Sequence, residues 1–298
     1  MINILLTGGS GFIGTSLKAR FSSTYNLILP SRKDLYNPDL FDKVDIVIHL
    51  AGKAHDTSNV SADADYEIAN TTLTNHLFDK FLKSNSTVFI FMSSILALKS
   101  SSCELLTEEF PHTPESIYAK SKSASELYIT NKLVPYCKSY YILRTPLVYG
   151  NGNKGNLPLL FDLIRRIPCW PLGCYDSKRS FCDVRNLSFV VHKLIENPEI
   201  KSGIYHIADN EEYDLNNLYY SISRFWGKVP RVVKIPKFII RTFFLIGTFL
   251  KLPFNSYQLQ KLTSTLLVSN DKIKKAIKSD LPFGGMIDLI TSQKNNYD

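Results

Sequence analysis

A tyrosine and a lysine four residues apart, Tyr118 and Lys122, could together move a proton. In the helix that residues 117–132 predict, this spacing places both side chains on one face. A free tyrosine, with a pKa of about 10, is a poor acid or base at neutral pH. A neighbouring ammonium favours the phenolate and brings this pKa closer to neutrality. We predict a catalytic pair, because the helix follows a strand that ends in Ser93 and Ser94.

A glycine-rich turn supplies a second chemical feature, a place for a phosphate. Residues 7–14 read TGGSGFIG, after an apolar run at 2–6 and before a predicted helix. Gly8 permits the tight turn, Gly11 lets a pyrophosphate approach the backbone, and Gly14 lets the helix pack closely on the strand. The free amides and the dipole of the helix N-terminus attract negative charge. The turn predicts a dinucleotide site; the alternative is a purely structural strand-to-helix turn.

The elements that must position these residues alternate along the first half of the chain. Strands are expected at 2–6, 26–29, 45–50, 87–92 and 140–143, and helices at 12–21, 63–83 and 117–132. Repeated βαβ units of this kind predict an α/β fold with a doubly wound parallel sheet, covered by helices on both faces.

The second half is less regular, but shows no internal repeat and no low-complexity linker. Helices are expected at 157–166, 184–196, 215–226 and 235–250, and a strand at 203–208. We expect residues 1–150 to form the core of a dinucleotide-binding domain. Residues 151–298 would form a smaller, mainly substrate-binding region, with segments that return to the sheet.

Composition is that of a soluble globular protein with a sizeable core, since 44% of the 298 residues are hydrophobic and 21% are charged. The formal net charge of +8 has two readings, a solvated basic surface or an anionic ligand such as a dinucleotide or nucleotide sugar. Nucleic acid is disfavoured, because the basic residues are scattered rather than gathered into a run with interleaved aromatics.

Cysteine usage and the N-terminus both favour a cytoplasmic protein. The five cysteines are odd in number and match no zinc spacing, so we expect reduced thiols and no metal site. The apolar run at 2–6 ends in glycines and lacks the features of a signal peptide. A second apolar stretch, 238–250, is too short to span a bilayer. We expect a buried helix there; the alternative is surface association with a membrane through this helix and the flanking Lys237 and Lys251.

The G-x-x-G-x-x-G spacing, with Thr7 before it and Phe12 and Ile13 inside it, resembles the extended short-chain dehydrogenase/reductases. These form the NAD-dependent epimerase/dehydratase family of nucleotide-sugar epimerases, dehydratases and reductases, which share the Rossmann fold. The resemblance extends over roughly two-thirds of the chain. It implies that Ser94 hydrogen-bonds the substrate oxygen, with Ser93 as the alternative. It also implies that Lys122 holds the nicotinamide ribose beside Tyr118.

The cofactor implied is NADP or NAD. Arg32 follows the second strand where an acidic residue would hold the ribose of NAD, and this favours NADP; a solvated loop charge is the other reading. Asn70 lies where the family has N-x-x-G-T, although Leu73 replaces the glycine, so a helix-surface residue is an equal alternative. The full set of expected cofactor contacts is Gly8, Gly11, Phe12, Ile13, Gly14, Arg32, Asp34, Leu35, Leu50, Ala51, Gly52, Asn70, Tyr118 and Lys122.

The substrate implied is a nucleotide sugar, most simply a UDP-sugar. Asn156 resembles a contact to the nucleotide diphosphate, whereas Leu147 replaces an asparagine that many members use for the sugar. Arg179 is a candidate clamp on the pyrophosphate, because its guanidinium fork suits phosphate oxygens; a solvated arginine is the alternative. His55 either faces the sugar or is a plain loop histidine.

Together these motifs are similar to bacterial surface-polysaccharide enzymes that reduce UDP-4-keto-6-deoxy-N-acetylhexosamines. The implied reaction is hydride transfer from NADPH to the 4-keto carbon, with Tyr118 donating the proton and Ser94 polarising the carbonyl. A UDP-hexose 4-epimerase with bound NAD and a non-catalytic NADP-binding regulator are the alternatives. The family also implies a homodimer through the helices that follow the third and fourth strands.

Overall fold

A computed structural model describes residues 1–53, 63–153, 156–250 and 255–294. Its centre is a six-stranded sheet in the order β2-β1-β3-β4-β5-β8, in which all neighbouring strands run parallel. Its strands are β1 (Asn3–Thr7), β2 (Asn26–Ile28), β3 (Ile46–His49), β4 (Val88–Met92), β5 (Ser139–Arg144) and β8 (Gly203–His206). Apolar runs form the central strands because both faces of the sheet are covered.

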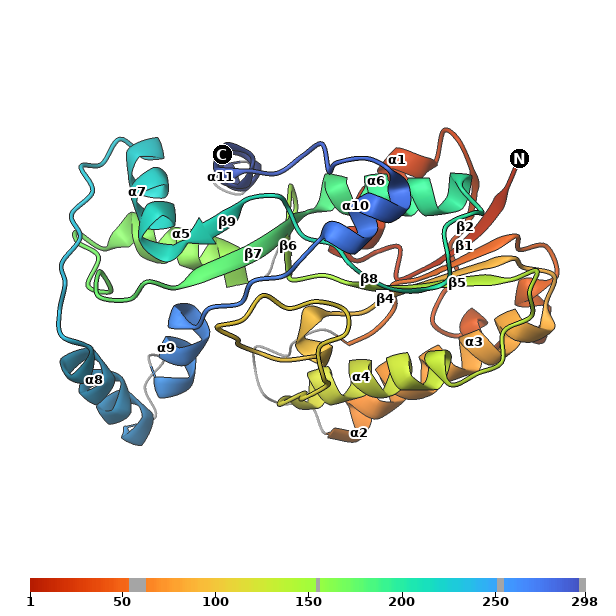
Figure 1. Ribbon diagram of the computed structural model, residues 1–298, viewed down its shortest axis with the longest axis horizontal. Coiled ribbons are helices and arrows are strands. Elements are labelled where there is room, and N and C mark those ends of the chain that lie inside the picture. Colours follow the sequence, from red (N-terminus) through yellow and green to blue (C-terminus); the bar gives the residue numbers. More distant parts are fainter. Residues whose placement is uncertain (54–62, 154–155, 251–254, 295–298) are drawn as a thin grey trace.

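Helices cover the two faces of this sheet, as Figure 1 shows. One face carries α1 (Phe12–Phe21), α6 (Val184–Glu196) and α10 (Asp271–Ile277), which share a buried apolar cluster with the strands. The other carries α3 (Leu73–Lys83) and α4 (Ile117–Thr130), which share a second cluster. The prediction of a doubly wound α/β fold is confirmed.

The strand order places a crevice between β1 and β3. From β1 the chain moves outward to β2 through α1, and then returns to the other side of β1 to form β3. Short 3-10 turns, Asp34–Tyr36 and Pro38–Phe41, occupy the return. Ligands of doubly wound sheets bind at such a switch point, at the carboxyl ends of the strands.

A second, three-stranded sheet contains β6 (Leu147–Tyr149), β7 (Lys178–Asp183) and β9 (Glu212–Asp214). The helices near it are α5 (Asn156–Arg166), α7 (Leu215–Phe225), α8 (Lys237–Phe249), α9 (Ser256–Thr263) and α11 (Met286–Lys294). A third apolar cluster, rich in aromatic side chains, lies among these elements. The division of the chain at residue 150 stays a prediction.

The segment 63–83 is helical as expected, but it is not a single regular α-helix. It consists of α2 (Asp63–Tyr66), a π-helical turn at Glu67–Thr72 and α3. The Thr74 hydroxyl donates a 2.5 Å hydrogen bond to the carbonyl oxygen of Asn70. Asn70, which accepts this additional bond, lies within the π-helical turn. Such turns often occur at functional sites.

A helix forms over the apolar stretch 238–250, as expected, but the expectation that it is buried is wrong. The helix α8 forms, but only Ile240 and Gly247 on it are buried, and most of its large apolar side chains are exposed. Its length of 13 residues matches the apolar run, which predicts a helix but does not specify what packs against it. Within the described residues, no helix combines the length and apolar character needed to cross a membrane.

Candidate active site

The glycine turn after β1 is tightly packed. Gly8 has φ +71°, and a Cβ there would lie 2.7 Å from the backbone nitrogen of Ala51. A Cβ on Gly14 would lie 2.2 Å from the carbonyl oxygen of Gly8. Both contacts are with backbone atoms, so a side chain at either position would force the backbone to shift, and glycine avoids this cost.

Gly11 differs from the other two glycines, because its side of the turn is less crowded. A Cβ on Gly11 would approach only the carbonyl oxygen of Gly8, at 3.3 Å. It precedes Phe12 as the N-cap residue of α1 and has no side chain to bind the first amides of the helix. These amides fit a phosphate group of a dinucleotide.

The loops after β2 and β3 border this turn. Arg32 and Asp34 are exposed after β2, whereas Leu35 is buried in the core. The Asp34 carboxylate accepts a 3.0 Å hydrogen bond from the amide of Ser31, and hydrogen bonds from Ser31 lower its pKa. After β3, the amide of Ala51 donates to the Thr7 hydroxyl at 3.1 Å.

His49, at the end of β3, is a buried neutral link between elements. Its Nδ1 lies 2.8 Å from the Thr7 hydroxyl and its Nε2 lies 2.9 Å from the Thr74 hydroxyl. Burial and the nearby charge of Lys122 lower the His49 pKa to about 3. His49 therefore joins β1, β3 and α3 beneath the loop at 50–52.

Asn70 is fully buried, so the helix-surface alternative for it is wrong. Its Oδ1 accepts from the amide of Lys53 at 2.7 Å, and its Nδ2 donates to the Ser121 hydroxyl at 2.9 Å. A Cβ on Gly52 would lie 2.7 Å from the same Oδ1. Asn70 thus fastens the loop of Gly52 and Lys53 to α4.

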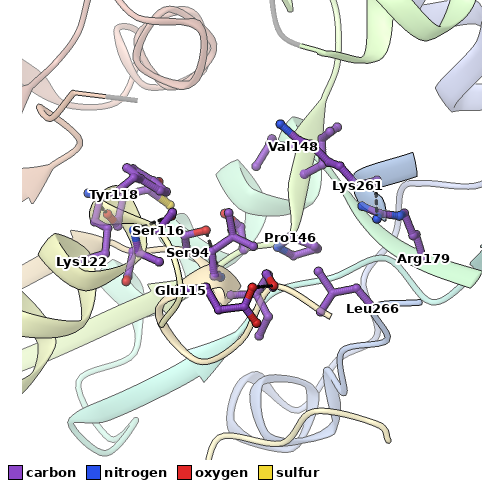
Figure 2. A pocket seen from close by; sticks show the side chains of 18 of the residues that line it. Ser94, Glu115, Ser116, Tyr118, Lys122, Pro146, Val148, Arg179, Lys261 and Leu266 are labelled. Atoms are coloured by element: carbon purple, nitrogen blue, oxygen red, sulfur yellow. Dashed lines mark hydrogen bonds between the residues drawn. The ribbon is translucent and has the colours of Figure 1, made fainter. Parts of the chain in front are cut away.

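Tyr118, Lys122 and Ser94 meet in one cavity, as Figure 2 shows. The helix α4 begins where the Ser116 hydroxyl accepts a hydrogen bond from the amide of Ala119, at 3.1 Å. One turn later, Lys122 Nζ donates to the carbonyl oxygen of Met92 at 2.8 Å. The Tyr118 hydroxyl is hydrogen-bonded to Ser94.

The expectation that the pKa of Tyr118 is lowered towards neutrality is wrong. Burial raises it to about 12, and the hydrogen bond with Ser94 opposes the rise only in part. Burial also lowers the pKa of Lys122 to about 8, against the opposing charge of Glu126. Burial, reinforced by the charge of Glu126, therefore keeps Tyr118 protonated at neutral pH.

The two adjacent serines are distinguished by their partners. The Ser93 hydroxyl donates to the Glu126 carboxylate, which forms a buried ion pair with Arg144 at 2.7 Å. The Ser94 hydroxyl instead accepts from the amide of Leu96 at 3.2 Å while it contacts Tyr118. This arrangement favours Ser94 over Ser93 for the substrate oxygen.

The cavity, of about 790 Å³, extends from these residues to the second sheet. Figure 2 shows Tyr118, Lys122 and Ser94 at one end and Arg179 and Lys261 at the other, with Pro146 and Val148 between them. Of the residues expected from sequence, those that line the cavity are Phe12, Ile13, Leu50, Gly52, Ser94 with its alternative Ser93, Tyr118, Lys122 and Arg179.

Arg179 lines the cavity, but its hydrogen-bonding fork is already engaged. It donates to the carbonyl oxygen of Ser264 at 3.1 Å, to the Ser264 hydroxyl at 2.5 Å and to the carbonyl oxygen of Lys261. The solvated alternative is therefore wrong. In the structure, Arg179 anchors the end of α9 through these bonds. Its guanidinium group is therefore not a free clamp for a pyrophosphate. Asn156 begins α5, but its side chain, like all of His55, lies outside the described part of the chain.

Lys261 is a cavity residue that sequence reasoning missed. It projects from α9 into the cavity, where burial and the charge of Arg179 lower its pKa. No motif contains it, and only the tertiary contact with Arg179 brings it there. Two adjacent cations make this end of the cavity suitable for an anionic group.

The fold and the site together define a dinucleotide-binding enzyme. Residues 4–208 match the model of the NAD dependent epimerase/dehydratase family, and the chain belongs to this family. The cofactor of its family is therefore a nicotinamide dinucleotide.

Three known proteins illustrate the similarity. The UDP-glucose 4-epimerase of Vibrio cholerae is 27% identical over 300 residues, covering 92% of this chain and 89% of that protein. The N-acetyl-alpha-D-glucosaminyl-diphospho-ditrans,octacis-undecaprenol 4-epimerase of Escherichia coli O157:H7 is 26% identical, covering 78% and 75%. The structure of RMD from Pseudomonas aeruginosa complexed with NADPH has a TM-score of 0.74 at 17% identity, covering 99% and 100%.

Proposed function

We propose that this enzyme is a nucleotide-sugar oxidoreductase, which uses NAD(P)H to reduce the 4-keto group of a UDP-4-keto-6-deoxy-N-acetylhexosamine for surface polysaccharide biosynthesis. The state of Tyr118 carries the proposal: its hydroxyl is hydrogen-bonded to Ser94 in the cavity, and its pKa is raised to about 12. A tyrosine that is protonated at neutral pH is ready to give a proton to a carbonyl oxygen.

The reaction needs few protein groups. A bound reduced nicotinamide supplies the hydride that adds to C4 of the sugar. Ser94 donates a hydrogen bond to the carbonyl oxygen, and Tyr118 transfers its hydroxyl proton to that oxygen as it becomes a hydroxyl group. The ammonium of Lys122 then stabilises the phenolate left on Tyr118. Arg179 and Lys261 face the diphosphate of the substrate.

NADP is the proposed preferred cofactor. Arg32 is exposed just beyond β2, where the adenosine ribose of a dinucleotide lies in doubly wound folds. A charge-assisted bond to a 2′-phosphate is worth about 1.5–3 kcal/mol. We therefore expect Arg32→Ala to weaken NADPH binding by roughly tenfold to a hundredfold, with NADH binding unchanged.

A 4-epimerase is the second candidate, favoured by the names of the two relatives from Vibrio and Escherichia. Such an enzyme first removes a proton from a hydroxyl group, which requires Tyr118 to be a phenolate. The non-catalytic alternative is disfavoured by family membership and by the presence of Tyr118, Lys122 and Ser94 in one cavity.

One assay separates these functions. The protein is incubated with UDP-4-keto-6-deoxy-N-acetylhexosamine and NADPH or NADH, and the absorbance of the reduced cofactor is followed. We expect net oxidation of NADPH, and a loss of roughly 10²–10⁴-fold in kcat for Tyr118→Phe. Conversion of UDP-glucose to UDP-galactose without added cofactor would contradict the reductase. Unchanged behaviour of Tyr118→Phe in every assay would favour the non-catalytic protein.

We also propose a cytoplasmic homodimer. All five cysteines are unpaired, which suits a reducing compartment. The helices α3 and α4 cover one face of the large sheet side by side, and Leu127 of α4 is exposed there. Sedimentation velocity of the purified protein tests the dimer.

A further inference from the structure

The helix α8 presents apolar side chains to solvent. Phe238 is 70% exposed and Phe249 is 87% exposed. The exposed set is Phe238, Ile239, Phe243, Leu245, Ile246, Phe249 and Leu250. Their spacings of three, four, seven and eight place most of them on one broad face. The opposite side, with Ile240 and Phe244, packs on the aromatic-rich cluster of the second sheet.

Charge is unevenly distributed along the chain, and α8 lies in its most basic part. Residues 215–270 contain eight lysines and arginines and no acidic residue. This segment therefore carries a charge equal to the formal +8 of the whole chain, and the rest is balanced. Basic residues that look scattered one by one thus meet no acidic residue within their own segment of the chain.

Two of these cations, Lys237 and Arg241, lie on α8 itself. They line a hollow of about 710 Å³ between α8 and α9, together with Tyr175 and Leu245. In the described ranges, neither cation has a carboxylate within ion-pair distance. They are placed beside the apolar face and are available to an external anion.

The position of α8 leaves this face accessible. Figure 1 shows α8 at one end of the long axis of the molecule, remote from the large sheet. It packs on α9, and Ile240, Phe244 and Leu259 belong to the same apolar cluster. The helix α9 in turn supplies Lys261 to the wall of the active-site cavity.

We propose that α8 docks on the surface of an anionic phospholipid bilayer. The apolar face enters the boundary between headgroups and acyl chains, and the neighbouring lysines and arginines bind lipid phosphates. A helix of 13 residues is about 20 Å long, so it lies in the plane of the interface rather than across it. The contact also places α9, and with it the cavity mouth, beside the membrane. This proposal is independent of the sugar that the enzyme uses.

Vesicle cosedimentation of the full chain tests the docking. We expect binding to vesicles of equal parts phosphatidylglycerol and phosphatidylcholine, and little binding to phosphatidylcholine alone. Phe238→Ser combined with Phe249→Ser should weaken binding to the anionic vesicles by roughly tenfold or more, because both rings enter the interface. Lys237→Glu combined with Arg241→Glu should weaken it similarly and reduce its salt dependence.

The matched control is Leu133→Ser combined with Tyr136→Ser, which removes two equally exposed apolar side chains between α4 and β5. The control should bind as the unaltered protein does. Circular dichroism verifies that each variant is folded. Absence of binding to anionic vesicles, or equal loss in the control, would overturn the proposal. A change from dimer to monomer in the phenylalanine variant, without vesicle binding, would identify the face as a contact between copies instead.

Discussion

Ser93 and Ser94 show how differently two identical neighbours can be used. The strand alternates its side chains between opposite sides, so consecutive hydroxyls point to different surroundings. Ser93 is committed to the buried Glu126–Arg144 pair, and Ser94 contacts Tyr118 in the cavity. The residue type alone cannot distinguish these roles.

We expect the two alanine variants to separate these roles. Ser94→Ala should lower kcat by roughly a hundredfold, because a donor to the developing oxyanion is lost. Its melting temperature should change little. Ser93→Ala should instead cost about 1–3 kcal/mol of unfolding free energy, because Glu126 loses a buried hydrogen bond. Turnover kinetics and urea unfolding of both variants provide the measurement. Loss of kcat in Ser93→Ala at unchanged stability would reverse the assignment.

At the scale of the element, the turn from β1 to α1 combines two kinds of glycine. Gly14 is required for packing, since a Cβ there would meet the Gly8 carbonyl oxygen at 2.2 Å. Gly11 has φ −74° and ψ 170°, which any residue adopts, and a Cβ there would meet only the Gly8 carbonyl oxygen, at 3.3 Å. The motif therefore contains one position that supports the fold and one that leaves room for a ligand.

This difference predicts opposite behaviour of two small substitutions. Gly14→Ala should lower the melting temperature, because backbone atoms must move apart to admit the methyl group. Gly11→Ala should leave the melting temperature nearly unchanged and weaken NADPH binding by at least roughly tenfold, because the methyl group occupies the path of the phosphates. Differential scanning fluorimetry and fluorescence titration with NADPH distinguish the two. Normal NADPH affinity in Gly11→Ala would place the dinucleotide elsewhere.

At the scale of the whole molecule, Asp209 joins the two sheets. It follows β8 of the large sheet, and its carboxylate accepts 2.8 Å hydrogen bonds from the amide of Asp183 and from Asn186 Nδ2. The hydroxyl of Tyr213, in the small sheet, donates a 3.4 Å hydrogen bond to the other carboxylate oxygen of Asp209. Burial raises the pKa of Asp209 to about 6, against the opposing hydrogen bonds from Asp183 and Asn186.

Stability should therefore depend on pH through Asp209. Its folded-state pKa exceeds its unfolded value, so the fold binds the proton more tightly. The contribution is fully present below about pH 4 and is lost as pH rises through about 6, an effect of roughly 3 kcal/mol. Asp209→Asn should remove this pH dependence, because an amide keeps the hydrogen bonds without ionising. Urea unfolding across this pH range measures it.

The exposed Asp280→Asn is the control for this effect, because it removes a carboxylate of the same type from the surface. Its unfolding free energy should follow the pH dependence of the unaltered protein. An identical pH slope in Asp209→Asn and the unaltered protein would show that Asp209 is not the group responsible.

Much of the fold could be predicted because its signals are local. The strand-turn-helix around Gly8 and the helix around Tyr118 are encoded in neighbouring residues, through apolar periodicity, turn chemistry and a spacing of four. These signals predicted the sheet, the helices on its two faces and the position of Tyr118 and Lys122 on one helix. They could not predict the π-helical segment at Glu67–Thr72, or the hydrogen bonds that Asn70 within it makes with the distant Lys53 and Ser121.

The sequence by itself determined the element order in the first half of the chain, the glycine turn and the tyrosine–lysine spacing, because each depends on residues close together in the chain. Only the tertiary structure decided which serine faces Tyr118, how burial shifts the Tyr118 pKa, and that α8 is exposed. It also placed Arg179 against Ser264, 85 positions away, and Lys261 beside both. Such contacts and desolvation arise from packing between distant segments, and no local pattern records them.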